Sequence, residues 1–137
     1  MNRIMFDTNA FDRLICDQFF PDVWQAASRG MLQLFTCEIQ EQEIARIENK
    51  RKRCLIQSIP RQVIASAASC EASGNHLHHD PKQMPPDLVI AHTAAQYCSL
   101  FVTEDRQLLQ WYREHYPDKH GSDYQQFICW FLEHFVT

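Results

Sequence analysis

Glycine is scarce in this chain, with only three residues in 137. A loop that cradles phosphate needs several glycines within one short segment, so nucleotide binding of that kind is disfavoured. No apolar run approaches the ~20 residues that a membrane-spanning helix needs. The N-terminal segment also lacks the long apolar stretch of a signal peptide. These absences predict a cytoplasmic protein without a membrane segment.

Paired cysteines and an excess of positive charge are missing as well. Six cysteines stand apart at positions 16, 37, 54, 70, 98 and 129, and none forms a CxxC pair, which argues against a zinc ribbon or redox motif. The formal net charge is −4, whereas proteins that bind nucleic acid by phosphate contacts alone are usually basic. A metal-dependent nuclease stays possible, because bound cations offset its clustered carboxylates.

Apolar side chains are abundant, at 45% of the chain with nine Phe. They can bury a core, and the length fits one domain. Short strands are expected at residues 3–6, 32–36, 62–65 and 99–103. Helices are expected at residues 10–19, 23–28, 40–56, 88–98, 105–115 and 124–135. This alternation predicts a single α/β domain over residues 1–137, a three-layer α/β/α fold with a short central parallel sheet.

Acidic residues stand where a doubly wound sheet brings chain segments together. Asp7 follows the first strand and Asp105 a later one, so both are expected at the carboxyl-end edge of the sheet, where such folds bind ligands. Glu43 lies on the helix after the second strand, and Asp87 opens another helix. Each also has an ordinary interpretation. Asp87 and Asp105 fit helix N-caps, and Glu43 fits a solvated helix residue. Asp7 fits the end of a strand in a turn, with Asn9 capping the helix that follows.

Four carboxylates in one pocket would indicate a metal site. Anions placed together repel one another unless a cation lies among them. Hard oxygen ligands favour Mg²⁺ or Mn²⁺ over zinc. A metal held in this way can activate water and stabilise charge on a phosphate. The predicted chemistry is phosphodiester hydrolysis.

Three segments in register resemble the PIN-domain family of nucleases. Residues 4–9 (IMFDTN) resemble the family's apolar strand that runs into Asp-Thr-Asn or Asp-Ser-Asn. Residues 86–94 (PDLVIAHTA) resemble its Asp-x-x-Ile-Ala-x-x-Ala helix, and residues 100–106 (LFVTEDR) its strand ending in Val-Thr-x-Asp-Arg. Residues 36–44 (TCEIQEQEI) are similar to the strand and helix that carry a Glu just before an apolar residue. The order and spacing match along residues 3–112.

The resemblance implies a metal-dependent ribonuclease that cuts single-stranded RNA without a protein nucleophile. Many small bacterial members are the toxins of type II toxin–antitoxin pairs of the VapBC kind, often homodimers silenced by a small antitoxin. The implied partners are therefore RNA, an antitoxin and a second copy of the chain. Asn9 and Thr103 would orient the metal ligands through hydrogen bonds. The implied ligands of Mg²⁺ or Mn²⁺, which also carry catalysis, are Asp7, Glu43, Asp87 and Asp105.

The glutamate ligand has alternatives, because Glu38 and Glu41 flank Glu43. The basic run at residues 50–53 is interpreted as a solvated helix end, which the helix dipole favours near a C-terminus. The sharper alternative is that Arg46 and Lys50 share the helix face of Glu43 and contact RNA phosphates.

Several other features have mainly structural interpretations. His76, His78 and His79 lie in an irregular segment, residues 69–86, and are interpreted as an exposed loop, with metal binding as the alternative. Trp111 and Tyr112 are expected to pack against the sheet rather than to stack on a base. The apolar face of the last helix is interpreted as core or as a dimer interface.

The leading functional hypothesis is a toxin endoribonuclease. One alternative keeps the same site but acts on DNA or in RNA maturation. Another is a PIN-like binding module without catalysis, which the presence of all four acids disfavours. A phosphoryl-transfer enzyme with an aspartyl-phosphate is less favoured, because the first strand ends in a single Asp.

Overall fold

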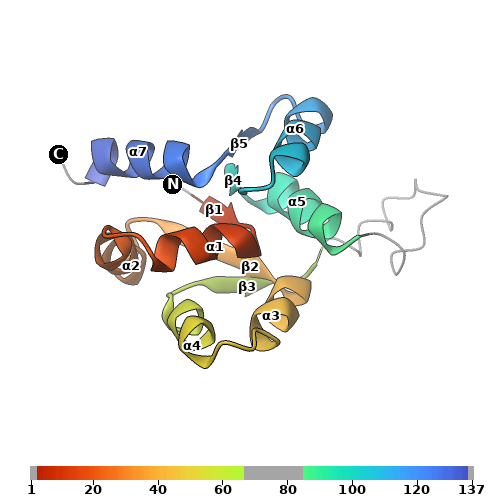
Figure 1. Cartoon of the computed structure of the whole chain (residues 1–137). Coiled ribbons are helices and arrows are strands. Elements are labelled where there is room, and N and C mark those ends of the chain that lie inside the picture. Colours follow the sequence, from red (N-terminus) through yellow and green to blue (C-terminus); the bar gives the residue numbers. More distant parts are fainter. Residues whose placement is uncertain (1–2, 67–84, 136–137) are drawn as a thin grey trace.

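The computed structural model describes residues 3–66 and 85–135, which form an α/β fold around one five-stranded sheet (Figure 1). The strands are β1 (Arg3–Phe6), β2 (Gln33–Cys37), β3 (Gln62–Ile64), β4 (Leu100–Val102) and β5 (His120–Ser122). The helices are α1 (Thr8–Ile15), α2 (Phe20–Ser28), α3 (Glu38–Ala45), α4 (Lys50–Ser58), α5 (Pro86–Tyr97), α6 (Arg106–His115) and α7 (Tyr124–Phe135). The predicted fold class is confirmed.

The sheet places β1 at its centre. Its strand order is β3-β2-β1-β4-β5, and every neighbouring pair is parallel. Phe6 at the end of β1 is in register with Val102 at the end of β4. The next residues along the chain, Asp7 and Thr103, therefore emerge beside each other at the carboxyl-end edge of the sheet. This is the edge at which open parallel sheets bind ligands.

Helices cover both faces of the sheet, as expected for parallel strands that are buried on both sides (Figure 1). Side chains alternate along β1, so that Ile4 and Phe6 face one helical layer while Met5 faces the other. The first layer includes α1, α2, α4 and α7, and the second includes α5 and α6. Phe6 meets Phe127 of α7 edge to face, with ring centroids 4.9 Å apart. This packing fixes the end of β1, directly before Asp7.

The predicted helix at residues 40–56 is wrong, because the structure has two helices there. The N–H groups of Arg46 and Ile47 donate to carbonyls three residues back, at 3.1 and 3.2 Å, where α3 ends. Asn49 then caps α4, and its side chain accepts a hydrogen bond from the Lys52 N–H at 3.0 Å. The break separates the acidic helix α3 from the basic run that follows it.

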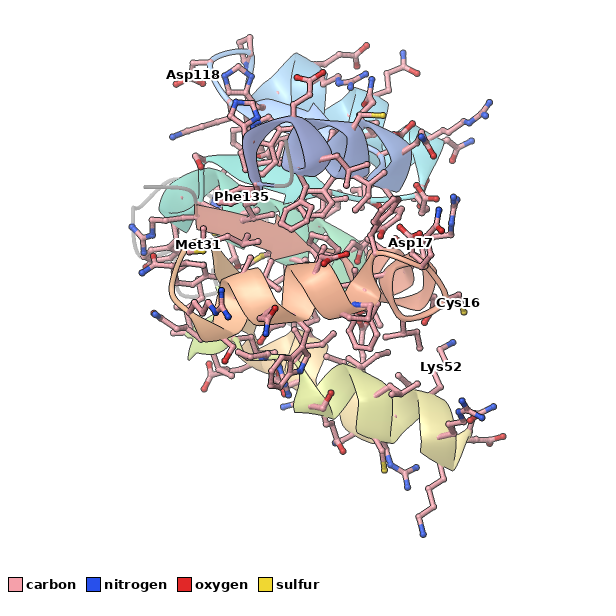
Figure 2. All side chains as sticks on the ribbon, turned by 90° about the vertical axis from the view of Figure 1, so that its left-hand side faces the viewer. Cys16, Asp17, Met31, Lys52, Asp118 and Phe135 are labelled. Carbon is pink, nitrogen blue, oxygen red and sulfur yellow. The ribbon has the colours of Figure 1, made fainter. Side chains whose placement is uncertain are left out.

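The basic run at residues 50–53 opens a helix instead of ending one, so the expected dipole benefit is also wrong. Other contacts hold two of its residues. Arg53 Nη1 donates to the Ile47 carbonyl at 2.7 Å, just beyond the end of α3. Lys52 Nζ lies 2.9 Å from Asp12 Oδ1 of α1 (Figure 2, where Lys52 is labelled on α4). These two contacts join α4 to the segment after α3 and to α1.

The sheet has one strand that the sequence analysis did not predict. β5 consists of His120, Gly121 and Ser122, a polar triplet with no apolar pattern, and its pairing with β4 defines it. The edge strand expected at residues 62–65 is confirmed as β3. The core interpretation of the last helix holds for Phe127, Ile128 and Phe131, which are buried.

No helix in the described ranges is both long and apolar enough to cross a membrane. The described cysteines are all free. Cys70, the histidines at 76, 78 and 79 and most of the irregular segment at residues 69–86 lie outside the described residues.

Candidate active site

Asp7 leaves the central strand and immediately caps α1. Its backbone N–H donates to the Val102 carbonyl at 2.8 Å, which extends the pairing of β1 with β4 by one residue. Its side-chain Oδ1 accepts a hydrogen bond from the Thr8 N–H at 2.8 Å. The predicted cap, Asn9, lies inside the helix, so that assignment is wrong. Asp7 is only 3% exposed, which makes it a buried carboxyl at the carboxyl-end edge of the sheet.

Thr103 connects Asp7 to the end of β4. Its buried hydroxyl donates to Asp7 Oδ2 at 2.8 Å and accepts from the Asp105 N–H at 3.1 Å. One hydroxyl therefore fixes both the rotamer of Asp7 and the backbone that presents Asp105. The predicted positioning role of Thr103 corresponds to these two contacts.

Asn9 joins the same loop from the other side. Its Oδ1 accepts a hydrogen bond from the Glu104 N–H at 3.0 Å, and the Thr103 hydroxyl lies 3.5 Å from the same oxygen. Asn9 thus ties the first turn of α1 to the β4–α6 loop, although its side chain makes no hydrogen bond to any of the four acids.

Glu43 reaches this centre through Thr8. The Thr8 hydroxyl donates to Glu43 Oε1 at 2.8 Å, across 35 positions of sequence. Thr8 therefore binds one acid through its backbone and another through its side chain. Thr8 belongs to the Asp-Thr-Asn motif, but nothing in the sequence indicated this contact, because it joins residues 35 positions apart.

The two neighbouring glutamates have other partners. Glu41 accepts from Arg61 Nε at 2.7 Å, from Arg61 Nη2 at 2.9 Å and from the Thr36 hydroxyl at 2.6 Å. The Arg61 guanidinium holds the pKa of Glu41 below its ordinary value. Glu38 is exposed and accepts from the Ser66 N–H at 3.3 Å. Of the three, Glu43 is the one bonded to the Asp7–Thr8 segment.

Asp87 and Asp105 approach from the two helices of the second layer. The N-cap of α5 is Pro85, so the expectation that Asp87 caps this helix is wrong; Asp87 lies exposed in the first turn. Asp105 does cap α6, with Oδ1 accepting from the N–H groups of Gln107 and Leu108 at 3.0 and 3.1 Å. Asp105 Oδ2 has no hydrogen-bond partner in the described part of the chain.

The electrostatics of Asp7 link three of the acids. Its pKa is raised from 3.8 to about 6. Burial is the largest cause, the negative charges of Asp87 and Glu43 also raise the pKa, and the hydrogen bonds from Thr103 and Thr8 lower it. No salt bridge reaches Asp7 from any described residue. A carboxyl that is buried, crowded by like charge and without a cation is expensive to ionise. A bound divalent cation would remove that cost.

The donor chemistry fits Mg²⁺ or Mn²⁺, although the ligands are not gathered tightly. All four acids offer hard oxygens. Within residues 3–66 and 85–135, no group of three or more His, Cys, Asp or Glu lies close enough to form a ready metal cage. Mg²⁺ does not require one, since it keeps several waters and is often held by one or two carboxylates. Asp7 and the free Oδ2 of Asp105 suit such a site best.

The cations expected near the site are arranged differently from the prediction. Arg46 is the C-cap of α3 and Lys50 begins α4, so the two do not share a continuous helix face with Glu43. Arg13 of α1 instead forms an ion pair with Glu104, the residue beside Asp105. No sequence signal linked Arg13 to this loop, because the contact joins residues 91 positions apart.

The two aromatic residues considered for base stacking pack against other rings of the protein. Tyr112 is buried against Phe101, with ring centroids 5.0 Å apart, as the packing interpretation predicted. Trp111 stacks on His115 of its own helix, with ring centroids 4.4 Å apart.

Relatives offer no independent support for this site. The chain matches no model of a known protein family, and no curated protein matches it either.

Proposed function

We propose that this chain is a PIN-type endoribonuclease that hydrolyses single-stranded RNA with a divalent metal. The α/β fold and the strand order around β1 agree with that family's three-layer architecture. The residues named by the motif resemblance follow β1 and β4 and begin or occupy α3, α5 and α6. Their arrangement at one edge of a parallel sheet supports a ligand site there.

One observation carries the proposal, namely the buried Asp7 carboxyl with two further acids acting on it. Burial of an acid that has no cation beside it costs stability, and a bound metal ion would remove that cost. The raised pKa of about 6 leaves Asp7 mostly ionised at neutral pH. An ionised, buried carboxylate held by Thr103 and Thr8 is preorganised to bind a cation.

Each residue would act on the metal or on its ligands. Asp7, Glu43, Asp87 and Asp105 would hold the cation, directly or through water. When bound, a divalent cation supplies Lewis-acid activation of water and stabilises charge on the phosphate. Thr103 keeps Asp7 Oδ2 oriented and fixes the backbone of Asp105. Thr8 holds Glu43 toward Asp7. The network limits the motion of the ligands, as hydrogen bonds around metal sites generally do.

We also propose that the protein is the toxin of a toxin–antitoxin pair, cytoplasmic and homodimeric, with a small antitoxin as its partner. The support is the motif resemblance, since members of this size are commonly toxins. Expression of the chain should arrest growth, and Asp7→Asn should abolish the arrest. Arrest that persists in the variant would contradict the proposal.

The nuclease is tested by incubating purified protein with labelled single-stranded RNA in Mg²⁺, in Mn²⁺ and in EDTA. Cleavage is expected only with metal, and should be absent from the Asp7→Asn/Asp105→Asn double variant. The matched control is Asp118→Asn, an exposed acid outside the site. Cleavage that survives in the double variant would show that other residues, or a contaminant, carry the activity.

A second candidate is a PIN-like binding module without catalysis. The lack of three closely gathered ligands in the described residues favours it. Calorimetric titration with Mn²⁺ separates the two candidates. Saturable binding that is lost in Asp7→Asn supports the nuclease, whereas no metal binding and no cleavage of varied RNAs would leave the binding module.

A further inference from the structure

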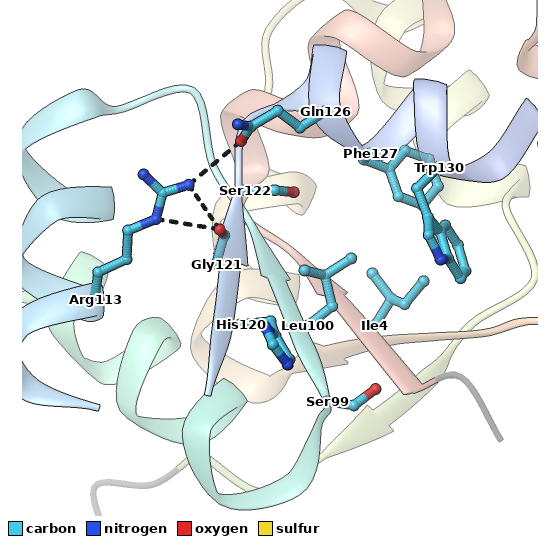
Figure 3. Close-up of a pocket in the computed structure, with 10 residues that line it drawn as sticks. All are labelled: Ile4, Ser99, Leu100, Arg113, His120, Gly121, Ser122, Gln126, Phe127 and Trp130. Atoms are coloured by element: carbon cyan, nitrogen blue, oxygen red, sulfur yellow. Dashed lines mark hydrogen bonds between the residues drawn. The ribbon is translucent and has the colours of Figure 1, made fainter. Parts of the chain in front are cut away.

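A pocket of about 520 Å³ lies between the edge strand β5 and α7 (Figure 3). Its apolar lining comes from Ile4 of β1, Leu100 of β4, and Phe127 and Trp130 of α7. The volume is within the range of sites that hold small organic molecules, roughly 300–1,000 Å³. None of the four acids of the candidate active site lines it, so it is a separate site.

A buried hydroxyl in this pocket lacks a partner. Ser122 is 8% exposed, and its Oγ makes no hydrogen bond within the described part of the chain. The alternation of β5 explains its direction. A Cβ on Gly121 would meet Leu109 and Tyr112, so that position faces the second layer and Ser122 faces the pocket. A buried polar group without a partner costs stability unless something supplied from outside satisfies it.

Arg113 brings a fixed positive charge to the rim. Its Nε and Nη2 donate to the Gly121 carbonyl at 3.3 and 2.9 Å, and Nη2 also lies 3.3 Å from Gln126 Oε1. These contacts hold the guanidinium at the sheet edge (Figure 3). Its Nη1 makes no hydrogen bond to any described residue, so its donors remain available for an incoming acceptor.

We propose that this pocket binds a small molecule with a flat apolar body and a carboxylate head. The body would lie among Trp130, Phe127 and the apolar floor of the sheet. The head would accept hydrogen bonds from the Arg113 guanidinium, which matches carboxylates in charge and shape. An acceptor atom on the body would satisfy the Ser122 hydroxyl. Apolar walls with a few fixed polar groups are the usual composition of small-molecule sites.

The test uses the full chain, labelled with ¹⁵N, and two probes with one ring system. 2-Naphthoate carries the carboxylate, and 2-naphthalenemethanol is its neutral counterpart. Binding is followed through the indole N–H signal of Trp130, assigned from a Trp130→Phe variant. We expect a saturable shift of this signal with 2-naphthoate and weaker binding of the alcohol.

Two variants assign the contacts. Arg113→Gln should lower the affinity for 2-naphthoate by about tenfold, which is the scale of a hydrogen bond to a charged group. The affinity for the alcohol should stay nearly unchanged. Ser122→Ala should lower the affinity for a third probe, 6-hydroxy-2-naphthoate, whose ring oxygen can accept from the Ser122 hydroxyl, by about threefold, and should leave the affinity for 2-naphthoate, which has no acceptor on its ring, unchanged. The variant should keep its fold, because it removes only an unpartnered hydroxyl. The matched control is Arg106→Gln, an exposed arginine of the same helix that does not line the pocket; it should bind both probes like the parent chain.

Three results would overturn the proposal. One is a well-dispersed spectrum with no saturable shift at Trp130 at millimolar probe. Another is equal weakening of 2-naphthoate by Arg113→Gln and Arg106→Gln, which would indicate general charge attraction. The third is a Trp130 signal that depends on protein concentration, together with a dimer that 2-naphthoate does not dissociate. This result would mean that a second copy of the chain fills the pocket. The metal-dependent cleavage of RNA is measured separately and is unaffected by any of these results.

Discussion

Replacing Asp7 with asparagine should make the metal-free protein more stable at neutral pH, and the burial of the carboxyl sets the size of the gain. Burial is the main reason that the pKa of Asp7 rises from 3.8 to about 6. Because the folded-state pKa is the higher one, the folded chain holds this proton more tightly than the unfolded chain. The stabilising contribution is complete below about pH 4 and is lost as the pH rises through about 6. The gap between the two pKa values corresponds to about 3 kcal/mol.

Asparagine avoids this loss because it stays neutral and has nearly the same shape. Relative to the parent, Asp7→Asn should gain up to about 3 kcal/mol of unfolding free energy between about pH 4 and pH 8 in EDTA. Urea unfolding at several pH values measures the difference by linear extrapolation. The exposed Asp118 supplies the matched control, since Asp118→Asn should show no comparable change with pH (Figure 2).

Bound metal should make the parent protein more stable than Asp7→Asn. A cation that binds only the folded parent stabilises it by about 2.7 kcal/mol at 100 times its dissociation constant and by about 4.1 kcal/mol at 1,000 times, so the order should reverse between these two concentrations. Asp7→Asn should lose most of this gain. If instead the variant is the less stable protein in EDTA at pH 8, or its advantage does not change with pH, the reasoning from burial is refuted. That result would not depend on whether the protein cuts RNA.

Substitutions at four further positions separate structural from functional roles. Glu43→Gln should abolish cleavage with little loss of stability. Glu41→Gln should keep cleavage but lower the free energy of unfolding in urea by about 1–2 kcal/mol, because it breaks a partly buried ion pair. The opposite pattern would assign the ligand to Glu41. Asp105→Asn should keep its melting temperature, because Asn caps helices as well as Asp does, and still lose cleavage. Thr103→Val should raise the pKa of Asp7 and move the pH–rate profile for cleavage upward, while Thr103→Ser should leave it in place; an unchanged profile in both would exclude the positioning role.

Strand ends were the part of the site that sequence could predict. The strand predicted at residues 3–6 contains an unbroken apolar run, Ile4 to Phe6, and an acid follows it, which is typical of a buried parallel strand. Its bounds agree with those of β1. Once two such strands are parallel neighbours, the residues that follow them must share an edge, so Asp7 and Asp105 could be expected at one edge without coordinates. The structure adds the hydrogen bond from Thr103 to Asp7.

Contacts that depend on helix ends could not be predicted in the same way. The segment at residues 40–56 has no glycine or proline, and Ile44, Ile47 and Leu55 are compatible with one helix face, so the apolar pattern does not mark the break between α3 and α4. The break becomes visible only through Asn49 and through the Arg53 side chain that reaches back to Ile47. β5 was missed for a related reason, because its strand character comes from its partner β4 and not from its own residues.

Helix capping by an acid does not exclude metal binding by the same residue. A carboxylate has two oxygens and about four acceptor positions. Asp105 uses Oδ1 for both of its capping contacts, which fixes the rotamer and leaves Oδ2 without a partner in the described chain. Asp7 uses one contact on each oxygen, from Thr8 and from Thr103, so each oxygen keeps an acceptor position. Capping therefore orients these acids at the strand ends without consuming their capacity to bind a cation, and the ordinary role is what prepares the proposed one.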